Sequence, residues 1–176
     1  HYLLKNEWGI YQDVSQESGL SHQGSESAAR FADYDNDGFL DLYVVKEGPN
    51  LLYRSTGEEQ FTNESALAGV GDEDPGSGAL CFDYDHDGDL DIFVSRRTSN
   101  LLYRNNLDGA FLEQGEKSGL AGAGEETVDA AFGDFDDDGD IDLLVINSDG
   151  AIMLYSNQRQ GIFHDISREA GIPNIP

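Results

Sequence analysis

Three short segments of the chain place aspartates at alternate positions of a glycine-bearing loop, a pattern suited to binding hard cations. Within each nine-residue segment, aspartate stands at positions one, three, five and nine, and glycine stands at position six. The segments are 33–41, 83–91 and 134–142. Calcium takes about six to eight oxygen ligands, and carboxylates at alternate positions of a tight loop supply them. The sequence therefore predicts three calcium sites, one in each of these Asp loops.

The expected ligands in each Asp loop are the four carboxylates and the main-chain carbonyl of position seven. Position seven is Phe39 in the first loop and aspartate in the other two, as expected where only the main chain binds. Glycine at position six permits the sharp turn that such a loop requires. The predicted ligand residues are Asp33, Asp35, Asp37, Phe39, Asp41, Asp83, Asp85, Asp87, Asp89, Asp91, Asp134, Asp136, Asp138, Asp140 and Asp142.

Two other interpretations of the Asp loops fit the sequence less well. A helix–loop–helix calcium site requires a bidentate glutamate at position twelve, where this chain has Val44, Val94 and Val145, each inside a strand-like run. Plain acidic turns are the second alternative, because aspartate and glycine favour turns in any case. Clustered carboxylates repel one another, however, so their threefold recurrence favours a bound cation. Magnesium is disfavoured because it prefers a rigid octahedron with retained waters.

The Asp loops belong to a repeat of about fifty residues, since their first aspartates, at 33, 83 and 134, are separated by 50 and 51 positions. A second block recurs in step with them: a Leu-Tyr pair, a turn containing glycine, an aromatic residue and a closing glycine. It begins at Leu52, Leu102 and Leu154. A fourth copy, which opens with Leu3-Leu4 in place of the Leu-Tyr pair, runs to Leu20 and has no Asp loop before it. The chain therefore holds three full repeats preceded by half a repeat.

Each full repeat has the pattern of four short strands. Val, Ile, Tyr and Phe dominate runs that are bounded by Gly, Asn, Pro and Asp. Four strands in about fifty residues is the size of one β-propeller blade. We therefore predict an all-β partial propeller, built from blades of four antiparallel strands and containing no long helix. The predicted divisions are a half blade at 1–27 and full blades at 28–77, 78–127 and 128–176.

The composition argues against several classes of function. Among the 176 residues, 35 are acidic and 10 are basic, which gives a formal charge of −25. Such an acidic chain repels the phosphates of nucleic acids and anionic membrane surfaces. No run of about eighteen apolar residues is present, so we expect no membrane span. Cys81 is the single cysteine of the chain, so no internal disulfide can form.

The repeats resemble the FG-GAP/VCBS repeats of integrin α-subunit β-propellers, and are closer still to those of bacterial secreted repeat proteins and cartilage acidic protein. Residues 101–106 (Leu-Leu-Tyr-Arg-Asn-Asn) and 132–143, which include the third Asp loop, carry the resemblance, and it extends from Tyr2 to Ile172. It implies a propeller in which each calcium loop joins the first two strands of a blade. It also implies extracellular or periplasmic work, usually adhesion or ligand presentation. Such propellers commonly have about seven blades, so this chain cannot close a ring alone.

We therefore expect a non-catalytic calcium-binding module that is secreted, periplasmic or at the cell surface, and that binds a protein or carbohydrate ligand. Two alternatives remain open: a hydrolase or lyase whose catalytic residues lie outside this segment, and a structural assembly protein. Residues 2–20 are expected to pair with two strands from outside the segment. Those strands would come from a longer parent chain, in preference to a second subunit.

A few other side chains have candidate roles. Trp8, in the first hairpin turn, is a candidate for an exposed aromatic contact, with packing as the alternative. Arg96 and Arg97 are expected to pair with nearby aspartates, although an anionic ligand is an alternative partner. His86, at position four of the second Asp loop, is expected to point away from the metal into solvent. A tyrosine that recurs in register is expected to pack between blades, at Tyr53, Tyr103 and Tyr155.

Overall fold

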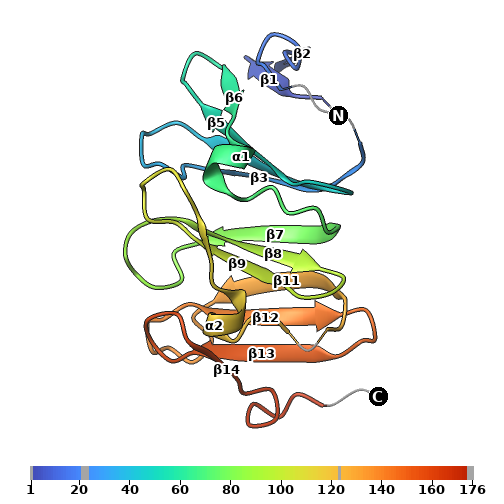
Figure 1. Cartoon of the computed structure of the whole chain (residues 1–176), viewed down its shortest axis with the longest axis vertical. Coiled ribbons are helices and arrows are strands. Elements are labelled where there is room, and N and C mark those ends of the chain that lie inside the picture. Colours follow the sequence, from blue (N-terminus) through green and yellow to red (C-terminus); the bar gives the residue numbers. More distant parts are fainter. Residues whose placement is uncertain (1, 21–23, 123, 174–176) are drawn as a thin grey trace.

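The strands of each sheet pair with their neighbours in the sequence, so the sheets are successive antiparallel meanders. The computed structural model describes residues 2–20, 24–122 and 124–173. In that part of the chain the strands form three four-stranded sheets and one two-stranded sheet. Figure 1 shows the sheets following one another along the long axis of the molecule, from the N-terminal to the C-terminal end.

The three four-stranded sheets share one strand order and one topology. The first contains β3 (Glu26–Ala32), β4 (Asp41–Lys46), β5 (Leu51–Ser55) and β6 (Phe61–Asn63). The second contains β7 (Gly76–Phe82), β8 (Asp91–Arg96), β9 (Leu101–Arg104) and β10 (Leu112–Glu113). The third contains β11 (Thr127–Gly133), β12 (Asp142–Asn147), β13 (Ile152–Asn157) and β14 (Phe163–Asp165). This arrangement is that of propeller blades, so the predicted fold class is confirmed.

The N-terminal half blade is a hairpin of β1 (Leu4–Glu7) and β2 (Ile10–Asp13). Its turn places Trp8 at φ 56° and Gly9 at φ 90°, and positive φ at both central residues suits the twist of a two-residue hairpin. Within the described residues this hairpin forms a sheet of two strands. The half blade predicted at the start of the chain is therefore present.

Two local features depart from the sequence prediction. The first strand of each full blade begins slightly before the expected boundary, at Glu26, Gly76 and Thr127, and contains a β-bulge near its start. A single helical turn follows the fourth strand in two blades, as α1 (Ser65–Ala68) and α2 (Gly115–Ser118). A helix of four residues is too short to produce helical periodicity in the sequence, so the pattern could not indicate it.

The hydrophobic core lies between consecutive blades. Tyr43 and Val45 of the first full blade pack with Ile92 and Val94 of the second. A corresponding cluster joins the second blade to the third and contains Phe82, Tyr84, Phe93, Leu102, Leu120, Leu143, Val145 and Phe163. Burying one such side chain contributes about 1.5–3 kcal/mol to folding. The blades are therefore stabilised by stacking on one another.

The recurring tyrosine contributes to these interfaces, as predicted. Tyr53 is buried with Leu20 from the end of the half-blade segment, and Tyr103 is buried in the cluster that joins the first and second full blades. Tyr155 is half-buried and packs against the cluster that joins the second and third. The tyrosines thus occupy equivalent places in successive interfaces.

Candidate metal centres

Each Asp loop connects the first and second strands of a full blade, as the family resemblance implied. In the first blade, the loop leaves β3 after Ala32 and enters β4 at Asp41, and these two residues face one another in the strand register. The corresponding pairs in the other blades are Phe82 with Asp91 and Gly133 with Asp142. A continuous antiparallel pair therefore holds both ends of every loop.

The aspartate at position one folds its own loop. Asp33 Oδ1 accepts the amide of Asp37 at 3.1 Å, and its Oδ2 accepts the amide of Gly38 at 3.0 Å. The same two bonds form at Asp83 and at Asp134. Position six is a glycine at φ 91–94° in all three loops, a conformation that glycine adopts without steric cost. The turn thus brings carboxylates of the same Asp loop close to one another.

The aspartate at position nine ties the loop to the third strand. Asp41 accepts the amide of Tyr34 at 2.9 Å through Oδ2 and the amide of Ser55, on β5, at 2.7 Å through Oδ1. Asp91 and Asp142 make the equivalent pairs of bonds in their blades. Burial raises the pKa of Asp41 to about 6 and that of Asp91 to about 8. Position nine was predicted only as a ligand, and the structure gives it this second role.

Carboxylate oxygens from three aspartates converge in each loop to within 4.8 Å of one another. Positions one and three belong to every group; position five completes the first group and position nine completes the other two. The groups are Asp33, Asp35 and Asp37; Asp83, Asp85 and Asp91; and Asp134, Asp136 and Asp142. An arrangement of oxygens alone suits magnesium, calcium or manganese rather than a thiophilic metal.

An orphaned buried oxygen shows that these groups fit a cation. Asp85 Oδ1, at position three of the second loop, is buried and has no hydrogen-bond partner among the described residues. Asp35 Oδ2, at position three of the first loop, likewise accepts no hydrogen bond, although it forms an ion pair with Arg54. A buried anionic oxygen without a donor is costly. A hard cation would satisfy it.

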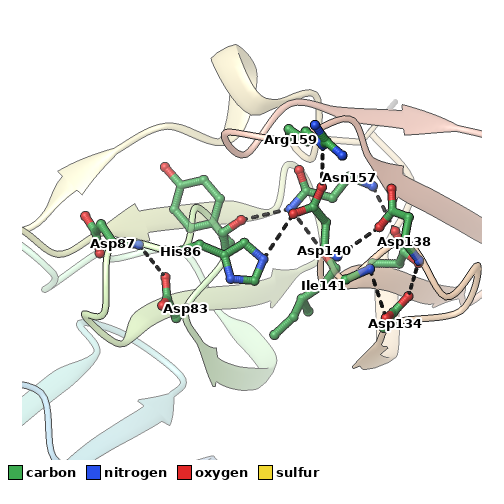
Figure 2. Close-up of polar contacts among 12 residues, drawn as sticks. Asp83, His86, Asp87, Asp134, Asp138, Asp140, Ile141, Asn157 and Arg159 are labelled. Carbon is green, nitrogen blue, oxygen red and sulfur yellow. Dashed lines mark hydrogen bonds and ion pairs between the residues drawn. The ribbon is translucent and has the colours of Figure 1, made fainter.

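Position seven directs its side chain toward the neighbouring loop where it is an aspartate. Asn36 Nδ2, at position four of the first loop, lies 3.3 Å from Asp89 Oδ1 in the second. His86 Nε2, at position four of the second loop, lies 3.1 Å from Asp140 Oδ1 in the third (Figure 2). His86 is exposed, as expected, and its imidazole also links two loops, which the sequence did not indicate. Phe39, the first loop's residue at position seven, is half exposed.

Two arginines that the sequence analysis did not assign to the sites contact the loops. Arg54 pairs with Asp35, and Arg104 pairs with Asp85 at 2.6 Å and with Asp87 at 2.7 Å. The signal was present in the sequence, because an arginine follows the Leu-Tyr pair in the first two full repeats. The carboxylate that this arginine contacts, however, depends on how the third strand aligns with the second.

Buried asparagines connect the first and second Asp loops to the blades that follow them. Asn105 Nδ2 donates to the carbonyl of Tyr34, at position two of the first loop, at 2.6 Å. Asn157 Nδ2 donates to the carbonyl of Tyr84, at position two of the second loop, at 2.8 Å (Figure 2). These bonds fix the spacing between blades at the edge that carries the Asp loops. No pattern in the sequence indicates these two bonds.

The remaining candidate side chains have separate positions. Trp8 is fully exposed at the hairpin turn rather than packed, and its role in an exposed aromatic contact stays a prediction. Arg96 is buried and pairs with Asp72 and Asp74, which confirms the expected local charge partner. Within the described segments, no helix combines the length and the apolar character that crossing a membrane requires.

Comparison with known proteins relates the chain to one family. A solved structure of an Agrocybe aegerita lectin, which recognises non-reducing terminal N-acetylglucosamine, is 21% identical with a TM-score of 0.47. That likeness covers 78% of this chain and 37% of the lectin chain, so this chain spans well under half the length of that protein. No curated protein matches. The FG-GAP-like repeat family matches residues 33–94 and 83–145, which together exceed half of the chain and include all three Asp loops. The chain therefore belongs to the FG-GAP-like repeat family.

Proposed function

We propose that this protein is a non-catalytic binding module in which each Asp loop holds one Ca²⁺ ion. The observation that carries the proposal is the threefold convergence of carboxylate oxygens at the same place in successive blades. A catalytic centre is a single, non-repeating cluster, whereas this chemistry recurs once per repeat. Such recurrence suits a structural and ligand-presenting role.

Calcium suits the loops better than magnesium. The donors are carboxylates and a main-chain carbonyl on a loop that water reaches, and calcium tolerates irregular coordination with a variable number of waters. In each loop the ion would be held by positions one and three, by positions five and nine, and by the carbonyl of position seven. When bound, it supplies positive charge at the centre of the carboxylate group and orders the loop.

The protein's own residues would transmit that order to the blade. Position nine accepts amides from both the loop and the third strand, as Asp41 does from Tyr34 and Ser55. An ion held beside it therefore stabilises the junction of three strands. Three ions would change the formal charge from −25 to −19, since each contributes +2, and lower the self-repulsion of the chain.

The same proposal gives a location and a class of partner. Asp loops exposed to water suit calcium concentrations near millimolar, which are extracytoplasmic, so we place the module outside the cell, in the periplasm or at the cell surface. Its partner would be a protein or a carbohydrate presented to the rigid edge of the blades. The remaining blades would come from a longer parent chain.

Calorimetric titration of cation-free protein tests the metal assignment. We expect three Ca²⁺ per chain and a stoichiometry of two for Asp85→Ala. Magnesium at the same concentration should bind more weakly and be displaced by calcium. Absence of binding at millimolar calcium would refute the proposal.

A further inference from the structure

A cationic side chain on the third strand reaches the carboxylates of two of the three Asp loops. Arg104, on β9, donates from Nε to Asp85 Oδ2 at 2.6 Å and from Nη2 to Asp87 Oδ2 at 2.7 Å. These are positions three and five of the second loop. In the first loop, Arg54 on β5 pairs in the same way with positions three and five, the second contact measuring 3.8 Å. Both arginines thus occupy carboxylates that a divalent cation would need.

The third loop has a neutral side chain in the equivalent place. Ser156 follows Tyr155 on β13, and Tyr155 faces Leu143 in the register as Tyr103 faces Ile92 in the second blade. Ser156 Oγ lies 3.5 Å from Asp136 Oδ2. The serine is therefore the structural counterpart of the two arginines and brings no positive charge to position three.

Two other side chains near the third loop, those of His86 and Arg159, contact a different carboxylate. His86 Nε2 and Arg159 Nε both face Asp140, at 3.1 Å and 3.8 Å respectively, and Arg159 is largely exposed (Figure 2). Asp140 is position seven, where the main chain rather than the side chain is the expected ligand. Among the described residues, the carboxylates of positions one, three and five in the third loop therefore form no ion pair with an arginine or a lysine.

The density of negative charge also increases along the chain. Of the nine loop positions, four are aspartate in the first loop, five in the second and six in the third. The third loop gains Asp137 and Asp140 over the first, in which the same positions are Asn36 and Phe39. Neither added side chain is an expected ligand, but the negative charge of both lies within the loop and attracts a divalent cation to it. Charge count and arginine placement thus favour the same loop.

An arginine and a divalent ion cannot share the same carboxylates without repulsion. The guanidinium remains charged at all physiological pH values, so a cation that enters the first or second loop must displace it or bind beside a like charge. Side-chain exposures of 46% for Arg54 and 34% for Arg104 leave room for displacement into water. The arginines should therefore weaken binding without preventing it.

We propose that Arg54 and Arg104 are built-in competitors for the cation, so that the third Asp loop fills first and the first two fill at higher cation concentration. This inference rests on the cation binding proposed above. Exchanging the residues at this one structural position should exchange the affinities of the loops.

The test is calorimetric titration of the cation-free protein with Ca²⁺ at low ionic strength, where exposed charges are least screened. The unmodified protein should show one tight step and two weaker ones. Arg104→Ser should tighten one weak step by about tenfold, and Ser156→Arg should weaken the tight step by about the same factor. Arg54→Ser provides a second, independent test in the first loop.

Two further variants assign the steps to loops, and a third controls for net charge. Asp136→Asn should abolish the tight step, whereas Asp85→Asn should abolish a weak one. Arg97→Ser removes the same charge from a side chain that pairs with Glu126, outside the loops, and should change each step by less than about twofold. Circular dichroism of every variant without cation establishes that it is folded.

The outcomes separate this inference from the proposed function. Three equal steps, or a tight step that is lost in Asp85→Asn and kept in Asp136→Asn, would overturn the competitor role while leaving calcium binding intact. Unchanged affinities in both Arg104→Ser and Arg54→Ser would do the same. Failure of the unmodified protein to bind any calcium would overturn both proposals.

Discussion

His86 Nε2 lies 3.1 Å from Asp140 Oδ1, so position four of one Asp loop contacts position seven of the next (Figure 2). Asn36 and Asp89 repeat this relationship one blade earlier, at 3.3 Å. The loops therefore form a contiguous row in which each is in contact with its successor. The same pairs of blades are also joined by the buried asparagines Asn105 and Asn157, whose side chains donate to main-chain carbonyls of the preceding Asp loop.

The buried asparagine bonds should contribute more to stability than the exposed imidazole contact. Removing a buried donor leaves its acceptor unsatisfied and costs about 1–3 kcal/mol, whereas exposed ion pairs contribute about 0–1 kcal/mol. Asn105 Oδ1 accepts the amide of Leu107, whereas Asn157 Oδ1 is buried and has no hydrogen-bond partner in the described part of the chain. Asn105→Ala should therefore destabilise more than Asn157→Ala, and both more than His86→Ala. Urea denaturation in EDTA measures this order, and a dominant effect of His86→Ala would contradict it.

Calcium should raise the melting temperature strongly. If the ion binds only the folded state, each site held at a hundred times its dissociation constant contributes about 2.7 kcal/mol, or about 5–10 °C for a domain of this size. In calcium, Asp85→Ala should lower the melting temperature by the contribution of one site. In EDTA, where no ion is bound, it should lower the melting temperature much less. Glu169→Ala, at an exposed position outside the loops, controls for the lost charge. Melting curves that are indifferent to EDTA would show that the loops are not coupled to folding.

Repetition made the Asp loops and the four-stranded blades predictable from sequence. The spacing of Asp33, Asp83 and Asp134 defined the repeat, and alternating carboxylates around a glycine gave the chemistry of the loop. Such features depend on residues that are close together in the sequence, so they can be recognised from a sequence pattern. The fold class followed because each strand pairs with its neighbour in the chain.

The partners of the loops depended instead on register and stacking, which no local pattern records. Arg104 reaches Asp85 across 19 residues because β9 pairs with β8 so that Tyr103 faces Ile92. Asn105 reaches Tyr34 across 71 residues because one blade stacks on another. The contact of His86 with Asp140 was not predicted for the same reason, since Asp140 belongs to the next repeat. To predict a contact between repeats, one must know how each blade is rotated relative to the next, and only the structure shows this.

The buried phenol of Tyr103 should make stability fall at alkaline pH. Burial raises the pKa of Tyr103 to about 12, above its value of about 10 in an unfolded chain. Between these values the unfolded state loses the proton while the folded state keeps it, so stability falls as pH rises from about 10 to 12. Tyr103→Phe should flatten this fall, measured by urea denaturation at pH 9–11. Tyr11→Phe, at an exposed position, should leave it unchanged.

Trp8 occupies a turn conformation that asparagine adopts more readily. Its φ of 56° is unfavourable for a large side chain, and its ring is fully exposed. Trp8→Asn creates the Asn-Gly pair preferred in two-residue hairpins and should stabilise the β1–β2 hairpin by about 0.5–1 kcal/mol. Trp8→Val, which is β-branched, should destabilise it. Amide exchange of the hairpin measures both, and a loss of protection in Trp8→Asn would show that the indole packs in solution.

Gly119 and Gly171 form a matched pair that isolates the contact between blades. Both close a repeat with positive φ, at 87° and 75°, so alanine at either position carries about 1–2 kcal/mol of backbone strain. A Cβ on Gly119 would lie 2.6 Å from the carbonyl oxygen of Phe163 in the next blade, whereas one on Gly171 would meet nothing within 4 Å.

Gly119→Ala must therefore push β14 away, and overpacking of this kind costs about 1–3 kcal/mol beyond the shared strain. We expect Gly119→Ala to be the more destabilising substitution by that margin in urea denaturation. Both proteins should be compared in EDTA, so that calcium binding does not mask the difference. Equal destabilisation would mean that Gly119 and Phe163 are not in close contact in solution, and the stacking of the second and third blades would then have to be revised.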